Sequence, residues 1–247
     1  MRKLLVSLVL ILGLAGDALA QEEARAVIER AVKAHGGEEK LAKTRAVQEK
    51  AKGTLYVNDM KIEFTAESTI RLPGQFKNVI QSEIQGTKVT LIQVLNGDKG
   101  WLSINGKTDL ADDKTLVGWK ELIHAGQVAT LVPLLKDNAY QLTLLGESKV
   151  NDRPALGVRV AAKGRKEVRL YFDKTSGLLV KRAYETLDSA TMKEVTHEEV
   201  SVGFQEIDGV KRPLEVVVYQ NGKKYLEGKL VEIKFLDKLD DSVFGRP

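Results

Sequence analysis

The segment ADDKTLVGWKELIHAGQVATLVPLL, residues 111–135, is the only helix-like stretch within a long series of strand-like segments. Asp112 or Asp113 can cap the start of a helix by accepting backbone N–H groups. Four apolar residues then recur at helical spacing and form one apolar face: Leu116, Trp119, Leu122 and Ile123. We expect Gly126 and Pro133 to divide the segment into two short helices.

An apolar helical insertion between antiparallel strands must bury its apolar face against the sheet. It can do so as permanent core or as a removable cover over a cavity. The sequence leaves both options open.

The residues on either side of this insertion show the patterns of strands and tight turns. Between residues 60 and 70, apolar and polar side chains alternate with period two, which is typical of a half-buried antiparallel strand. Short turn pairs follow one another along the chain: Asn58-Asp59, Gln85-Gly86, Asn96-Gly97, Asn105-Gly106 and Asn221-Gly222. The segments 87–95 and 214–219 are apolar on both faces and should be covered on both sides.

These patterns predict a mainly β (α+β) fold with about eleven or twelve strands. Short connections indicate a meander, and an antiparallel sheet of this size must curl. We therefore predict an incomplete β-barrel with a central helical cover and an N-terminal helix over residues 22–35. Gly36-Gly37 should end that helix, with His35 in a capping role in its last turn.

Residues 1–20 have the pattern of a secretory signal. Arg2 and Lys3 precede an apolar run of about 11 residues, shorter than the roughly 20 that a spanning helix needs. Ala18-Leu19-Ala20 forms a small-x-small cleavage site, so we expect a single mature domain over residues 21–247. The chain has no cysteine, hence no lipoprotein acylation site and no disulfide, and is expected to be periplasmic or secreted without an integral membrane span.

Composition argues against several classes of function. A formal charge of +4, spread along strands with alternating sign, does not suit nucleic acid. His35, His124 and His197 lie in no metal-type spacing, and no phosphate loop, dinucleotide fingerprint or nucleophile elbow occurs. We expect no metal, no cofactor and no enzyme activity, with His124 at a surface or boundary position rather than acting as a general base.

Asp240-Asp241 can cap a final helical turn. A hydrolase that pairs one of these acids with another elsewhere in the chain is unsupported, but the sequence leaves it open.

Four segments resemble those of the periplasmic carriers and sensors built on the lipoprotein localisation factor fold, specifically the outer-membrane-lipoprotein-sorting-like proteins. They are KAHGGEEKLAK at 33–43, IRLPGQFK at 70–77, VLNGDKGWLSING at 94–106 and YFDKTSGLLVKR at 171–182. EIDGVKRPLEV at 206–216 and LDDSVFGRP at 239–247 are similar to the closing strands of that family.

The resemblance implies an apolar cavity, between a curved sheet and its helical cover, that takes lipid or lipoprotein acyl chains. Taken singly, each aromatic residue is better explained as ordinary core, and only the resemblance favours the cavity. The residues expected to line the cavity are Ile62, Phe64, Phe76, Ile80, Leu91, Trp101, Trp119, Leu122, Ile123, Leu131, Leu134, Leu170 and Phe172.

In the carriers, an arginine beside the proline of an R-P-x-x-F segment helps to hold the lid closed. Here Leu72 occupies that position, and Arg71, one residue earlier, is the candidate for a lid contact although a strand would point it to the opposite face. We expect a monomer that binds lipid and works with a membrane protein of the envelope. The alternative is an envelope interaction or sensor module whose cavity is filled by its own side chains.

Overall fold

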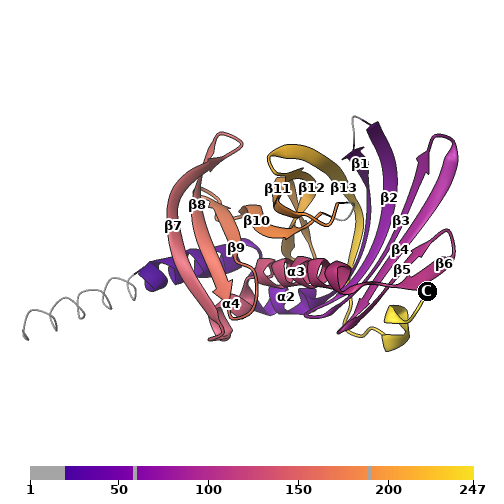
Figure 1. Ribbon diagram of the computed structural model, residues 1–247. Helices are drawn as coiled ribbons and strands as arrows, with labels where there is room; N and C mark the ends of the chain where they lie inside the picture. The colour runs from indigo at the N-terminus through magenta and orange to yellow at the C-terminus, as the bar shows by residue number, and fades with distance from the viewer. Residues whose placement is uncertain (1–19, 58–59, 189–190) are drawn as a thin grey trace, which may run out of the picture.

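One antiparallel sheet of thirteen strands, curved around helices but not closed, makes up most of the molecule (Figure 1). The computed structural model describes residues 20–57, 60–188 and 191–247. The strands are β1 (Ala46–Val57), β2 (Met60–Arg71), β3 (Gln75–Ile84), β4 (Thr87–Asn96), β5 (Lys99–Ile104), β6 (Lys107–Leu110), β7 (Tyr140–Val150), β8 (Arg153–Ala162), β9 (Val168–Asp173), β10 (Leu179–Leu187), β11 (Glu194–Ile207), β12 (Val210–Gln220) and β13 (Lys223–Phe235).

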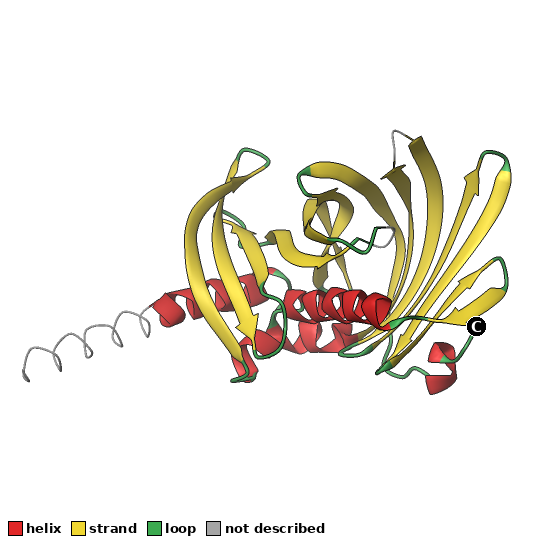
Figure 2. Ribbon diagram, in the orientation of Figure 1, coloured by secondary structure: helices red, strands yellow, loops and turns green. Residues whose placement is uncertain are grey.

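The helices lie together on the concave side of the sheet (Figure 2). They are a helix over residues 20–34, α2 (Glu38–Ala42), α3 (Asp113–Ala129) and α4 (Val132–Lys136). Two 3-10 turns complete the described segments, η1 (Lys43–Arg45) and η2 (Asp241–Phe244). The predicted fold class, a curved sheet with an N-terminal helix and a central helical cover, is confirmed.

The strand order joins two meanders into one sheet. The order is β6-β5-β4-β3-β2-β1-β13-β12-β11-β10-β9-β8-β7, so among the described strands only β1 and β13 pair across a long sequence separation. Their register sets Val47 opposite Phe235 and Leu55 opposite Leu226. The helices α3 and α4 carry the chain from one edge, β6, to the other edge, β7 (Figure 1).

Local turn chemistry explains the meander. Asn105 and Asn221 both have positive φ and are each followed by a glycine with positive φ, as two-residue hairpin turns require. Asn105 Oδ1 also accepts a hydrogen bond from the backbone N–H of Thr90, at 2.8 Å. The turn predicted at Asn58-Asp59 lies outside the described residues.

Helix α3 begins as the sequence predicts but ends later. Asp112 caps it, since its side chain accepts a hydrogen bond from the N–H of Thr115, at 2.8 Å. The prediction that Gly126 breaks the helix is wrong, because α3 continues to Ala129 and the break comes at Leu131, whose φ is 67°. A glycine inside a helix costs only about 1 kcal/mol, and burial of the neighbouring Val128 offsets this.

The first half of α3 packs closely against β5 at Gly100. A Cβ atom at Gly100 would lie 2.7 Å from Leu116 Cδ2 and 2.9 Å from Trp119 Cζ3. No side chain fits between helix and sheet there, so Gly100 sets the depth at which α3 rests on the concave face.

The second half of α3 belongs to a larger core with the N-terminal helix. Ile28 and Ala31 are fully buried there together with Val128 and with Val158 of β8. The N-terminal helix ends at the predicted glycines, and a Cβ at Gly36 would lie 2.1 Å from the carbonyl oxygen of Gly209.

The predicted signal segment falls almost entirely on residues 1–19, outside the described residues, and Ala20 and Gln21 are helical. None of the helices in the described part of the chain has the length and apolar character needed to cross a membrane.

A pair of glycine substitutions tests the close contact between α3 and β5. Gly100→Val should lower the free energy of unfolding by about 1–3 kcal/mol through overpacking against Trp119. Gly126→Ala is the matched control, because a Cβ at Gly126 would meet no other atom within 4 Å. This substitution should raise the free energy of unfolding by about 0.5–1 kcal/mol. Urea unfolding followed by Trp fluorescence measures both. Equal stability of the two variants would contradict the packing described here.

Candidate functional site

Helix α3 divides the concave face of the sheet into a sealed part and an open part. Phe76 and Leu95 pack under α3 with Trp119 and Ile123 in one buried cluster. The Phe76 and Trp119 rings meet edge to face with centroids 5.5 Å apart. These side chains are structural core, so three of the predicted cavity residues, Phe76, Trp119 and Ile123, are sealed beneath the helix.

Four further predicted residues are sealed in the other half of the sheet. Leu131, Leu134, Leu170 and Phe172 are each no more than 3% exposed and belong to the core around the N-terminal helix. Phe172 also borders a small hollow of about 210 Å³ beside Val27.

The open part of the concave face is a wall of apolar side chains beyond α3. Register places Ile62, Phe64, Ile80 and Leu91 on the same face as Phe76, since Ile80 pairs with Leu91, and Phe76 pairs with Leu95. All four are partly exposed, and the buried clusters among the described residues leave them out. In Figure 1 the strands β1–β4 extend well past α3. The structure thus brings these four predicted residues together on an accessible surface.

Two predicted residues lie elsewhere. Trp101 pairs with Val94 and Leu110, so it points to the convex face, away from α3. Leu122 lies at the surface of α3 and is 36% exposed, outside the cluster that holds Trp119.

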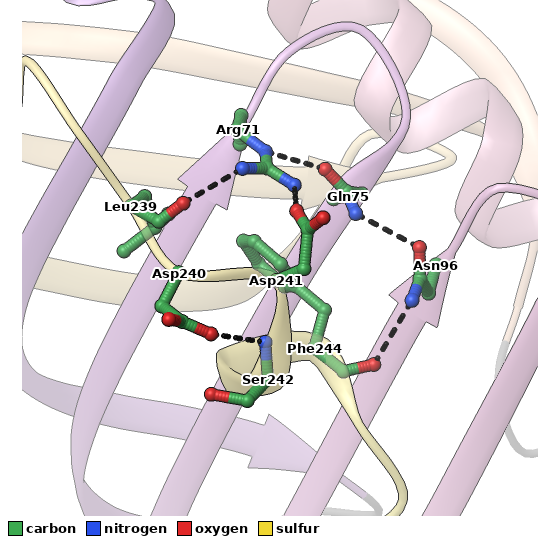
Figure 3. A network of polar contacts seen from close by, with 8 residues as sticks. All are labelled: Arg71, Gln75, Asn96, Leu239, Asp240, Asp241, Ser242 and Phe244. Atoms are coloured by element: carbon green, nitrogen blue, oxygen red, sulfur yellow. Dashed lines mark hydrogen bonds and ion pairs between the residues drawn. The ribbon is translucent and has the colours of Figure 1, made fainter.

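Arg71 contacts the C-terminal segment rather than the helical cover (Figure 3). Its guanidinium forms an ion pair with Asp241 and donates to the carbonyl oxygen of Leu239, at 2.8 Å. It also lies over the ring of Phe244, 5.3 Å from the centroid, and Phe244 is fully buried. As predicted, Asp240 caps this last turn through the N–H of Ser242. Arg71 therefore holds η2 against the convex face.

This C-terminal segment covers β4 from outside. Val94 and Leu95 are both 0% exposed although they point to opposite faces. Leu95 lies under α3, and η2 contacts β4 from the other side. The prediction that residues 87–95 are covered on both sides is correct for this end of β4.

A hollow of about 490 Å³ over β1–β3 has a charged rim. Its lining includes Lys50, Lys52 and Glu67, and Lys50 bridges Glu67 and Glu232 at 3.8 and 3.5 Å. These side chains are on the opposite face from Phe64. A rim of this kind does not suit acyl chains.

The concave face also holds a group of polar residues that sequence reasoning missed. One row of directly paired residues crosses seven strands from β9 to β2: Leu170, Arg182, Glu199, Val218, Leu226, Leu55 and Ile62. Directly paired residues share a face, so Arg182 and Glu199 point inward between apolar neighbours. Arg182 donates to Glu199 at 2.7 Å, and Arg212 donates to Glu49 at 2.6 Å.

The sequence carried a signal for this group. Lys181-Arg182 and Glu198-Glu199 are consecutive charged pairs in successive strands. Neighbouring strand residues face opposite sides, so one member of each pair must point inward.

Burial and pairing set the ionisation of these groups. Burial alone would raise the pKa of Glu199, but the Arg182 guanidinium holds that pKa below its usual value. Burial lowers the pKa of His197 to about 4, with Glu199 opposing and Arg182 adding to the shift. Burial raises the pKa of Tyr184, whose ring lies 5.0 Å from that of His197. At neutral pH Arg182 and Glu199 therefore form a charged ion pair beside a neutral His197.

Similar solved structures share this arrangement of sheet and helices. A LolA superfamily protein of Nitrosomonas europaea superposes with a TM-score of 0.57 at 11% identity, covering 90% of this chain and 97% of that one. A DUF1329 family protein of Desulfovibrio piger gives a TM-score of 0.56 at 12% identity, with coverages of 90% and 97%. A Vibrio parahaemolyticus domain described as outer membrane lipoprotein-sorting gives 0.54 at 10% identity, with coverages of 91% and 97%.

The chain has the LolA fold. No family model matches the sequence, and no curated protein matches it either. At these identities the likeness establishes the fold alone, and the fold expected from the sequence resemblance is confirmed.

Within this LolA fold, the open concave wall can do two things chemically. Its partly exposed apolar side chains can bury hydrocarbon, and its paired charges can hydrogen-bond a polar group. Among residues 20–57, 60–188 and 191–247, no group of three or more His, Cys, Asp or Glu side chains is placed to hold a metal ion.

His197 should make the protein acid-sensitive. Its pKa is about 4 when folded against about 6.5 when unfolded, so its contribution is complete above pH 6.5 and is lost as pH falls toward 4. The loss should approach about 1.4 kcal/mol per pH unit. Urea unfolding of wild type and His197→Phe at pH 7, 6, 5 and 4 measures it. We expect the free energy of unfolding to fall less steeply with decreasing pH in the variant than in wild type. Parallel pH dependences of the two proteins would contradict the role given to His197.

Proposed function

We propose that the protein is a non-catalytic carrier that binds lipid or lipoprotein acyl chains on the open part of the concave face. The observation that carries the proposal is the wall formed by Ile62, Phe64, Ile80 and Leu91, which stays partly exposed beyond α3. Contiguous exposed apolar patches on a folded protein commonly mark a surface that binds another molecule.

The energetics of such a wall suit hydrocarbon. Each methylene removed from water contributes about 0.8 kcal/mol, so a chain of about ten methylenes supplies on the order of 8 kcal/mol before losses of entropy. No reactive group is needed for this. The pairing of Arg182 with Glu199 and of Arg212 with Glu49 supports a binding role over a hydrolytic one.

The description of the Vibrio parahaemolyticus domain as lipoprotein-sorting supports the same class of ligand. We propose that the mature protein, residues 21–247, acts as a monomer. We propose the periplasm as its location, because residues 1–20 have the pattern of an export signal. A membrane protein of the envelope would then supply or receive the cargo.

One half of the molecule supports the alternative function, an interaction or sensor module whose cavity is filled by its own side chains. Leu131, Leu134, Leu170 and Phe172 fill the space between the sheet and the N-terminal helix with core. An interaction or sensor module would use this filled scaffold without a lipid, which the experiment below distinguishes.

The test is native mass spectrometry of protein purified from the periplasm, followed by organic extraction and by uptake of an added fatty acid and an acylated lipopeptide. We expect an extractable lipid mass, or uptake of at least one added probe. An apo mass with no uptake would overturn the carrier and favour the interaction module.

Phe64→Asp should reduce uptake at least about tenfold, because it places a charge in the apolar wall at a cost exceeding 1.4 kcal/mol. Thr65→Asp is the matched control, on the same strand but on the opposite, exposed face. It should bind as wild type does. Thermal unfolding checks that both variants fold, and equal loss of uptake in the two would remove Phe64 from the site.

A further inference from the structure

The open concave face contains charged residues that acyl chains do not need. Arg182 and Glu199 have side chains only 16% and 21% exposed, and Arg212 and Glu49 are 32% and 23% exposed. Removing ions from water is unfavourable, and apolar residues of similar volume would often serve stability as well or better. Their presence on this face therefore calls for a chemical role.

These charges are continuous with the apolar wall. Glu199 is paired with Val218, and that row continues through Leu226 and Leu55 to Ile62. On the other side, Glu49 is paired with Ser68, and the row continues through Asn78 to Gln93. On β3, Asn78 of this second row lies between Phe76, which is sealed beneath α3, and Ile80, which is partly exposed. A molecule lying on the apolar wall would therefore meet the polar row of Glu49 at its inner end, and Arg182 and Glu199 lie close enough to Glu49 and Arg212 to interact with them electrostatically.

The polar group has an excess of donors. A guanidinium carries five N–H groups, yet Arg182 and Arg212 each donate one side-chain hydrogen bond, to Glu199 and to Glu49. The Nε atoms of both arginines and the hydroxyl of Tyr184 are buried and have no hydrogen-bond partner among the residues that the structure describes. Buried polar atoms without partners are rare in folded proteins. What this surface lacks is an oxygen acceptor.

We propose that the concave face binds a phospholipid with its phosphate ester inward, against Arg182 and Arg212, and with its acyl chains on the wall around Phe64. This rests on the proposed carrier function and names its class of ligand. A phosphate ester offers several acceptor oxygens at once, and arginine is the side chain best matched to it. Because two arginines face two glutamates, the site is neutral overall and does not demand a net anionic lipid.

The competing explanation is that the two ion pairs only brace the strands that they join. The pairs connect β10 to β11 and β12 to β1, so a bracing role fits their positions. Ion pairs that only connect the strands would have no effect on which lipid binds. Ion pairs that bind a head group would determine which lipid binds.

The experiment compares three lipids with identical acyl chains: phosphatidylethanolamine, phosphatidylglycerol and diacylglycerol. The mature protein is equilibrated with each lipid in the same detergent, and bound lipid is counted by native mass spectrometry. We expect both phospholipids to bind at least about tenfold more tightly than diacylglycerol.

The double variant R182Q/E199Q removes one pair without leaving a lone buried charge, and should lose most of that preference while still binding diacylglycerol. The matched control is R169Q/E185Q, which removes an ion pair between the neighbouring strands β9 and β10 on the opposite face. It should keep the wild-type preference, and thermal unfolding shows whether each variant folds.

Equal binding of the three lipids by wild type would overturn this inference while leaving the carrier function standing. A full preference retained in R182Q/E199Q would assign the pair to bracing and also overturn it. Binding of none of the three lipids would overturn this inference, whereas the carrier function is overturned only if the fatty acid and the acylated lipopeptide are not taken up either.

Discussion

Pairing between β1 and β13 is the interaction on which the rest of the structure depends. Each meander could form from local hairpins, but only this seam makes them one sheet. The seam is tight at its centre, where Gly53 faces Gly228 and a Cβ at Gly53 would lie 2.1 Å from the carbonyl oxygen of Glu227. Through it, the apolar wall of the first meander becomes continuous with the charged pairs of the second.

Helix α3 then decides which parts of that sheet remain accessible. It rests on Gly100 at one end and joins the core of the N-terminal helix at the other. The strands extend beyond the helix (Figure 2), and the apolar side chains Ile62, Phe64, Ile80 and Leu91 beyond it stay partly exposed. A cover of this length leaves the molecule with both a buried core and a partly exposed apolar surface on the same face of the sheet. Of the two options left open by the sequence, the structure shows α3 packed against the sheet as core, with the open apolar wall lying beyond it.

Much of the fold could be predicted because its signals are local. The alternation between residues 60 and 70, the Asn-Gly turns and the Asp112 cap each act within a few residues, and each appears in the structure. The thirteenth strand and the unbroken α3 were missed, since short strands such as β6 give weak patterns and tertiary packing overrides one glycine.

The site was harder to predict because it depends on register and on distant segments. The run Trp101-Leu102-Ser103-Ile104 carries apolar residues on both faces, and only its pairing with β4 shows that Trp101 points outward. Phe76 and Phe64 share a face and a sequence pattern, yet one is sealed and the other open because of where α3 lies. Arg71 was singled out by its neighbours in sequence, but its partner Asp241 is 170 residues away.

Because β1 and β13 are far apart in the sequence, they are made at very different times during synthesis. A chain made from its N-terminus completes β1–β6 well before β13 exists, so one edge of β1 stays unpaired for most of translation. Exposed strand edges associate with other chains unless charged side chains discourage it. Gln48, Lys50 and Lys52 alternate along that edge, and the cations among them provide this protection until Lys234 and its neighbours arrive to pair with it. The strand that pairs with β1 is thus almost the last part of the protein to be made.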